Sequence, residues 1–315
     1  MHGDEGVVRL PGGGLFYHCR MRLIPGVLLG SAVLAGSGLV QAVAAQPAAP
    51  ASPTTAAASL AAGSPEWIVD RFFVQKEFPE LERYATGEFA ELYEGSATLG
   101  SIVPANVTVT SRILERDAAH AIFNISMTDS NVTKEWYAYL RVDAGMWKVE
   151  AIRTLMLPAK FFETILAVER AAVAGRLNEL GVQELDRSHL TIASDAELKA
   201  HFISQQPLFA ALAKDFAALS SIDVVNFDGK VAPEGGATAE QAVGLAQQLR
   251  SLRLGAAIRK YRDCEGCVVL LIGGDGANQV GYLHAPPGAR VPKMSPQSFI
   301  YVEPIAPGWY LFKTV

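Results

Sequence analysis

Two cysteines near the C-terminus, Cys264 and Cys267, have the spacing that most suggests chemistry in this sequence. A Cys-x-x-Cys pair can be a redox centre, half of a zinc site or a tight disulfide. The redox reaction relies on a helix that begins at the first cysteine and lowers the pKa of its thiol, whereas strand-like segments flank this pair. A zinc site needs two further ligands, and the sequence has no second cysteine pair. We therefore expect a disulfide, with the redox centre, the zinc site and reduced thiols as the alternatives.

The sequence contains none of the short motifs that identify a hydrolase, a metalloprotease or a phosphate-binding loop. The glycine-rich turn from Gly273 to Gly276 is followed by a strand, whereas a phosphate site needs the N-terminus of a helix. The histidines His189, His201 and His284 stand far apart, and no spacing joins them into a metal site. The sequence therefore predicts no metal and no cofactor, and its catalytic residues are unknown.

Residues 21–45 have the order of a secretory signal peptide: a basic start, an apolar run, and small residues before a cleavage point. We expect cleavage after Ala44 or Ala45, with residues 1–20 as an upstream extension. The alternative is an uncleaved anchor, because about 20 apolar residues can span a bilayer, although Pro25 and several glycines interrupt the run. The Ala-rich composition is typical of bacteria with GC-rich genomes, so the expected destination is the periplasm or the medium.

Residues 46–64 are mainly Ala, Pro, Ser and Thr without a charge, which predicts a flexible linker. The rest of the chain is rich enough in apolar residues to exclude a wholly disordered protein. The formal net charge of −5 makes broad electrostatic binding to nucleic acid unlikely as a function. Three cysteines are too few for a fold that depends on a framework of disulfides.

Residues 65–157 combine a helical stretch with four alternating, strand-like runs. Ser64, Pro65 and Glu66 have the residue types that open a helix, and apolar residues then recur at helical spacing until Gly95. The strand-like runs alternate with a period of two, which predicts an antiparallel sheet with one covered face.

The last two runs also predict a register. We expect Ala144 and Gly145 to form a two-residue loop, because a slip by one residue would mix apolar and charged faces. The expected facing pairs are Val142 with Trp147, Arg141 with Lys148, Leu140 with Val149, and Tyr139 with Glu150.

The final hairpin has an aromatic-rich strand, then Asp143-Ala144-Gly145 and Trp147-Lys148-Val149. With helices before it, this region resembles the nuclear-transport-factor-2-like superfamily, which has a cystatin-like roll. The resemblance implies helices packed on a curved sheet to form a cone, with a pocket at its wide end. Members of this superfamily are isomerases, dehydratases, hydrolases or proteins that only bind. Their catalysis usually rests on a buried carboxylate base beside Tyr or Asp donors.

The resemblance makes four polar residues candidates for the lining of such a pocket: Asp70, Tyr84, Tyr93 and His120. They do not form a motif that could be transferred from the superfamily. Asp70 can equally be a solvated helix residue, and His120 an exposed or hydrogen-bonded strand residue.

Residues 158–182 are predicted to form one amphipathic connecting helix that ends at Gly181. Residues 183–315 predict a second α+β domain, which resembles no family that we can name. Capping boxes open two of its helices, with Ser194 and Glu197 in the first and Thr238 and Gln241 in the second. From residue 257 onward, five short runs separated by turns predict an antiparallel β-meander. The predicted fold class is α+β throughout.

These features favour an exported, non-catalytic binding or protein-interaction module of the bacterial envelope. The expected partner is a small apolar ligand or an envelope protein, not a nucleic acid, and only an uncleaved signal segment would contact a membrane. One alternative is an isomerase, dehydratase or hydrolase that uses the cone pocket. Another is a disulfide-handling protein that uses Cys264 and Cys267.

Overall fold

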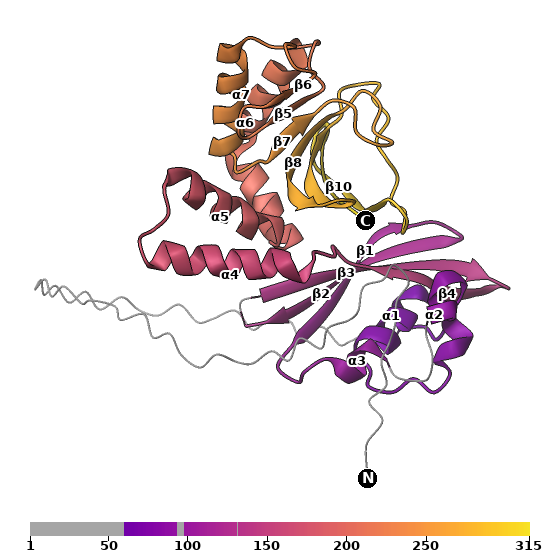
Figure 1. The fold of residues 1–315 in the computed structure, drawn as a ribbon. Coiled ribbons are helices and arrows are strands. Elements are labelled where there is room, and N and C mark those ends of the chain that lie inside the picture. The colour runs from indigo at the N-terminus through magenta and orange to yellow at the C-terminus, as the bar shows by residue number, and fades with distance from the viewer. Residues whose placement is uncertain (1–59, 93–97, 131) are drawn as a thin grey trace, which may run out of the picture. The chain divides into compact units, whose positions relative to one another are not determined.

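The computed structural model describes residues 60–92, 98–130 and 132–315 (Figure 1). The chain divides into two units, Met1–Ala61 and Ala62–Val315, and the fold below is that of the second. The predicted extension at 1–20, the signal peptide at 21–45 and the linker up to residue 59 lie outside the described residues.

Short helices form the first part of the fold. The first helix starts where the sequence predicts, because the Ser64 hydroxyl caps it by accepting a hydrogen bond from the Trp67 amide at 3.2 Å. The helical stretch is not continuous, since it consists of the four short elements α1 (Pro65–Phe73), η1 (Leu81–Tyr84), α2 (Gly87–Leu92) and α3 (Leu99–Ile102).

An antiparallel sheet with the strand order β1-β2-β3-β4 follows. Its strands are β1 (Thr108–Arg116), β2 (His120–Asp129), β3 (Val132–Asp143) and β4 (Met146–Arg153). Ala144 and Gly145 form the loop between β3 and β4, and both have the positive φ that a tight hairpin turn of this length favours. The predicted register is confirmed up to Leu140 and Val149, but Tyr139 then pairs with Ala151. Glu150 is therefore the extra residue of a β-bulge, which the alternating pattern does not reveal.

The short helices cover one face of this sheet, as the apolar pattern predicts. Ile68, Phe72 and Phe73 of α1 share a buried cluster with Phe123 of β2 and Leu140 of β3. The prediction that only one face is covered is wrong, however. The opposite face carries Tyr137 and Tyr139, which are also buried and belong to the large core of the second half of the chain.

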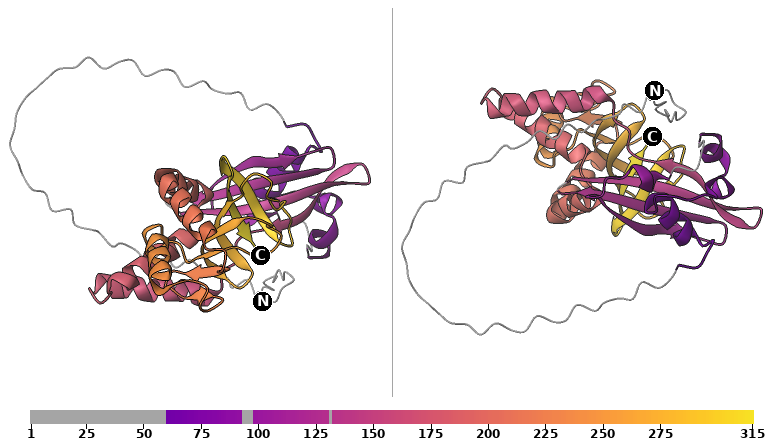
Figure 2. Two further views of the ribbon diagram at one scale, coloured as in Figure 1. Left: turned by 90° about the horizontal axis from the view of Figure 1, so that it is seen from above. Right: turned by 90° about the horizontal axis from the view of Figure 1, so that it is seen from below.

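The predicted single helix over 158–182 is wrong. The segment forms two helices, α4 (Ala159–Val173) and α5 (Glu179–Thr191), which pack against each other (Figures 1 and 2). The chain leaves α4 through Gly175, whose φ of 64° favours glycine. Gly181 lies in the first turn of α5, where its amide donates to the Asn178 side chain at 2.9 Å. Asn178 thus caps the start of α5, and Gly181 does not end a helix as the sequence suggests.

Both predicted capping boxes are confirmed. Ser194 and Glu197 open α6 (Asp195–Ala218), and Thr238 and Gln241 open α7 (Ala239–Ser251). Helix α6 is interrupted at Gln205, two residues before Pro207, because proline lacks the amide that would continue the helix.

The second sheet has seven antiparallel strands in the order β10-β11-β9-β8-β7-β5-β6. Its strands are β5 (Val224–Asn226), β6 (Val231–Ala232), β7 (Ala256–Ile258), β8 (Val268–Asp275), β9 (Asn278–His284), β10 (Phe299–Ala306) and β11 (Trp309–Thr314). It departs from a simple meander because β11 lies between β9 and β10. Residues 226–237 are polar and glycine-rich, which predicts a loop, but β6 lies within them and β5 ends at their first residue. The α+β class with two antiparallel sheets is confirmed.

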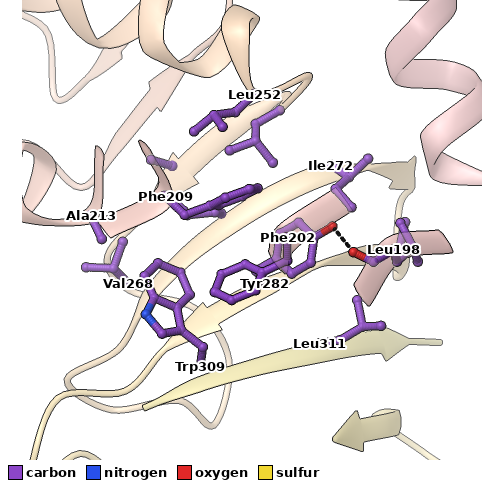
Figure 3. Packing of buried hydrophobic residues seen from close by; sticks show 14 of the residues in the cluster. Leu198, Phe202, Phe209, Ala213, Leu252, Val268, Ile272, Tyr282, Trp309 and Leu311 are labelled. Atoms are coloured by element: carbon purple, nitrogen blue, oxygen red, sulfur yellow. Dashed lines mark hydrogen bonds between the residues drawn. The ribbon is translucent and has the colours of Figure 1, made fainter. Parts of the chain in front are cut away.

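Aromatic side chains join α6 to this sheet (Figure 3). Phe202 and Phe209 of α6 contact Tyr282 of β9, with ring centroids 5.5 and 5.0 Å apart. The Tyr282 hydroxyl donates to the carbonyl of Leu198 at 2.8 Å, so its polar end is satisfied inside the core. None of the helices in the described part of the chain has both the length and the apolarity that a bilayer crossing requires.

Candidate functional site

The candidate pocket residues of the first sheet are not linked to one another. Asp70 accepts a hydrogen bond from Gln75 at 3.1 Å, and His120 is exposed beside Asp117. Tyr84 stacks on Phe78 at 5.2 Å between ring centroids, and Tyr93 lies outside the described residues. In the described part of the chain, no hydrogen bond or ring contact joins any two of these candidates. Side chains of the first core, including Phe72, Phe73 and Leu81, are buried between helices and sheet.

The structure instead reveals a buried cluster of charged residues that sequence reasoning missed. Glu135 lies on β3, Asp195 is the first residue of α6, and Lys313 lies on β11. The Lys313 ammonium contacts a Glu135 oxygen at 2.8 Å and an Asp195 oxygen at 2.7 Å. All three side chains are at most 6% exposed. We call these three residues the buried charge cluster.

Neutral donors complete the hydrogen bonding of the cluster. The Asn124 side-chain amide donates to Asp195 at 2.8 Å, and the Tyr137 hydroxyl donates to the same carboxylate at 3.1 Å. Both Glu135 oxygens accept from the backbone amide of Asp195 at 2.9 Å. This amide belongs to the first turn of a helix and has no acceptor within the helix, so Glu135 supplies one. The negative carboxylate also interacts favourably with the positive, N-terminal end of the helix dipole.

Two carboxylates share one ammonium group here. Burial raises the pKa of Glu135 to about 7, an effect that the Lys313 charge opposes and the Asp195 charge reinforces. Burial lowers the pKa of Lys313, but Asp195 and Glu135 outweigh this effect and leave the pKa raised. Lys313 is therefore charged at neutral pH, whereas Glu135 changes its protonation state close to neutral pH.

A second ion group extends the network on the same side of the first sheet. Arg112 of β1 forms two hydrogen bonds with Glu303 of β10, at 3.0 and 2.8 Å, and Lys199 of α6 forms a third at 2.7 Å. Burial alone would raise the pKa of Glu303, but these donors and the Tyr301 hydroxyl lower it to about 2. The Tyr301 ring stacks on Tyr137 at 5.0 Å, which connects the two ion groups.

This arrangement joins the first sheet to α6 and to the second sheet. Each side chain of the buried charge cluster has its hydrogen-bonding partners within the protein, as buried charges require. A reacting molecule would have to displace those partners before it could reach Glu135 or Asp195. The network therefore has the features of a structural interface between the two sheets.

A sequence signal for this cluster exists, but it is weak. Glu135 comes directly before the run Trp136-Tyr137-Ala138-Tyr139-Leu140, and Lys313 follows the run Trp309-Tyr310-Leu311-Phe312, so each is a charged residue beside aromatic and apolar ones. The capping box at Ser194 fixes Asp195 at the start of a helix. Sequence separations of 60 residues between Glu135 and Asp195, and of 178 between Glu135 and Lys313, hide their proximity.

A cavity of about 570 Å³ opens between α6 and the second sheet. Its lining consists of Ala210, Ala213, Lys214 and Ala217 of α6, Arg259 and Lys260 after β7, Gly266, Cys267 and Val268, and His284 and Pro286. Ala213 and Val268, both visible in Figure 3, are buried and make its floor apolar. A volume of this size is within the range of small-molecule sites.

The charged residues around the cavity differ in whether their charged groups already have partners within the protein. The Arg259 guanidinium donates to the carbonyls of Phe216 and Leu219 at 2.9 and 3.0 Å, and so caps the end of α6. Lys260 is paired with Asp223 at 3.0 Å. Lys214 is exposed, and within the described part of the chain it has no hydrogen-bond or ion-pair partner. Its ammonium can therefore contact a ligand without losing another partner.

His284 lies beside Trp309, with ring centroids 4.6 Å apart. Burial lowers the pKa of His284, so its ring is neutral at pH 7. No hydrogen bond from another described side chain orients this ring, whereas a catalytic base is normally held by such a partner.

The expected disulfide between Cys264 and Cys267 is present. Both cysteines are buried, and they close the turn that leads from β7 into β8, without the helix that would activate a thiol. In the described residues, no group of three or more His, Cys, Asp or Glu side chains could hold a metal ion.

Comparisons with family models, with curated proteins and with solved structures find no match to this chain. The function proposed below therefore rests on the sequence and on the geometry of the described residues.

Proposed function

We propose that the chain is an exported, non-catalytic binding module, and that the cavity between α6 and the start of β8 is its ligand site. The observation that carries this proposal is the contrast between the cavity and the buried charge cluster. The cavity is open, has an apolar floor and presents Lys214, which has no partner in the part of the chain that the structure describes. The cluster holds the carboxylate with the most useful pKa for catalysis, but its partners enclose it.

A catalytic acid or base must reach its substrate and must have a pKa close to the working pH. Glu135 meets the second condition but is buried among Lys313, Asp195 and Tyr137. Among the described residues, none that lines the cavity carries a carboxylate. The groups around it are cations and one neutral imidazole, which suit binding better than proton transfer.

We also propose that residues 65–157 are a nuclear-transport-factor-2-like domain that acts as a scaffold. Its helices followed by a four-stranded antiparallel sheet are consistent with that resemblance. Burial of aromatic side chains between them favours a structural role over a second ligand pocket.

The binding proposal can be tested with a fragment library screened by ¹⁵N NMR on the purified chain. We expect the amides of Gly266, Cys267 and Val268 to shift with the ligands that bind. Ala210→Trp should fill the cavity and abolish these shifts. Ala211→Trp is the matched control, because Ala211 is an exposed neighbour on α6 that does not line the cavity. Shifts that survive Ala210→Trp, or a screen without shifts at the cavity, would overturn the proposal.

Export is tested separately by N-terminal sequencing of the native protein. We expect the mature chain to begin at Ala45 or Gln46. A chain that retains residues 23–40 would instead support the uncleaved anchor.

A further inference from the structure

The cavity carries an excess of positive charge, although the chain as a whole has a net charge of −5. Lys214, Arg259 and Lys260 contribute three positive charges to its lining, and His284 contributes none because it is neutral. Among the described residues, Asp223 is the one acid paired with these groups, and it binds Lys260. The local field therefore favours an anion over a cation or a neutral molecule.

The positions of these cations limit what kind of anion fits. Arg259 commits Nε and Nη2 to the backbone carbonyls of Ile222, Phe216 and Leu219, so it adds fixed positive charge, and of its three nitrogens only Nη1 is without an acceptor among the described residues. Lys260 shares its ammonium with Asp223. Within the described part of the chain, Lys214 is the one of the three whose whole charged group has no partner. A phosphate group is usually held by several converging donors, whereas one ammonium is enough for a carboxylate.

The apolar floor of the cavity limits the chemistry of the part of the ligand that does not contact Lys214. Ala213 and Val268 are buried, and the rings of Pro286 and His284 continue the surface towards Trp309. These groups offer contact area and few hydrogen bonds, so a compact apolar body gains the most from entering.

We propose that this cavity binds a small organic monoanion, with its carboxylate on Lys214 and its apolar body against Ala213 and Val268. This inference rests on the proposed function, because it assigns a ligand class to the same cavity.

The test compares two probes of nearly equal shape, 2-naphthoate and its neutral analogue 2-naphthamide, by ¹⁵N NMR titration of the purified chain. We expect naphthoate to shift the amides of Gly266 to Val268 and to bind about fivefold more tightly than naphthamide, which is the ratio that one partly exposed ion pair supplies. Raising the salt concentration should weaken naphthoate binding and leave naphthamide unchanged.

Lys214→Met should reduce the preference for naphthoate, because only the charges of Arg259 and Lys260 then remain, and leave naphthamide affinity unchanged. Lys293→Met is the matched control, because Lys293 is an exposed lysine away from the cavity lining, and it should keep the preference. Equal binding of the two probes, or a preference that Lys214→Met leaves unchanged, would overturn the monoanion inference and leave the binding function standing. Failure of both probes, together with a fragment screen that finds no ligand at the cavity, would overturn both.

Discussion

Replacing Glu135 with Gln should change how the free energy of unfolding depends on pH. Burial raises the pKa of Glu135 to about 7 in the folded chain, against an ordinary value of 4.5. The folded chain therefore binds this proton more tightly than the unfolded chain does. The stabilising contribution is fully present below pH 4.5 and is lost as the pH rises through about 7. Between pH 5 and pH 8 this amounts to about 2–3 kcal/mol of unfolding free energy.

The wild-type profile alone cannot isolate this effect, because a histidine acts in the opposite direction. Burial lowers the pKa of His201 from 6.5 to about 4. Its contribution is present above pH 6.5 and is lost as the pH falls through about 4. That loss is about 2 kcal/mol at pH 5 and nearly offsets the gain from Glu135. The difference between wild type and Glu135→Gln cancels the histidine and leaves the carboxylate.

The assay is urea unfolding followed by circular dichroism at pH 5, 6, 7 and 8. We expect the stability advantage of the wild type over Glu135→Gln to shrink by about 2–3 kcal/mol from pH 5 to pH 8. Glu163→Gln is the matched control, since Glu163 is exposed on α4, and its profile should parallel the wild type. A Glu135→Gln profile that also runs parallel to the wild type, within about 0.5 kcal/mol, would refute the titration assigned to Glu135.

Three further substitutions test the network and the disulfide. Lys313→Met should lower the unfolding free energy by about 3 kcal/mol or more at pH 8, because it leaves two buried carboxylates without their ammonium. The loss should be smaller at pH 5, where Glu135 is protonated, and equal losses in the urea assay at both pH values would contradict this. Tyr137→Phe should cost about 1–2 kcal/mol in the same assay, since a buried carboxylate loses one donor; an unchanged midpoint would mean that the hydroxyl contributes nothing. Replacing Cys264 and Cys267 together with Ser should cost about 2 kcal/mol, because the closed loop is short. Wild type that melts at the same temperature with and without reductant would argue against the disulfide.

Local features were predictable from the sequence because their physical causes are local. The caps at Ser64, Ser194 and Thr238 each depend on a side chain that reaches a backbone amide within three residues. The hairpin register followed from the match of apolar and polar faces across a two-residue loop. The disulfide followed from close spacing between strands.

Features that depend on competition between signals were missed. Gly181 looks like a helix end, but Asn178 is a better start for the next helix, and Gly175 provides the turn before it. The bulge at Glu150 leaves both flanking pairs apolar, so the alternating pattern does not record it. The strands β5 and β6 are too short and too rich in polar neighbours to show a period.

The candidate site was the least predictable feature, because its residues come together through the tertiary fold alone. Asp70, Tyr84, Tyr93 and His120 were chosen as polar groups within one domain, whereas the cavity combines α6 with the starts and ends of distant strands. Exposed alanines and a lysine on a helix have the appearance of an ordinary solvent face. Their significance depends on Arg259 and Lys260, which the fold brings beside them.

The second face of the first sheet shows why a polar strand residue is ambiguous in a sequence. Tyr137 and Glu135 alternate with apolar residues, which is the pattern of a solvated face. They are buried instead, because Asp195 and Lys313 from distant segments satisfy their polar atoms. The interface thereby excludes water while it keeps charges that a purely apolar contact would lack. Such charges add little net stability, but a mispaired arrangement would leave a buried carboxylate unpaired at a cost of several kcal/mol. The network therefore favours one arrangement of α6 and β11 against the first sheet over its alternatives.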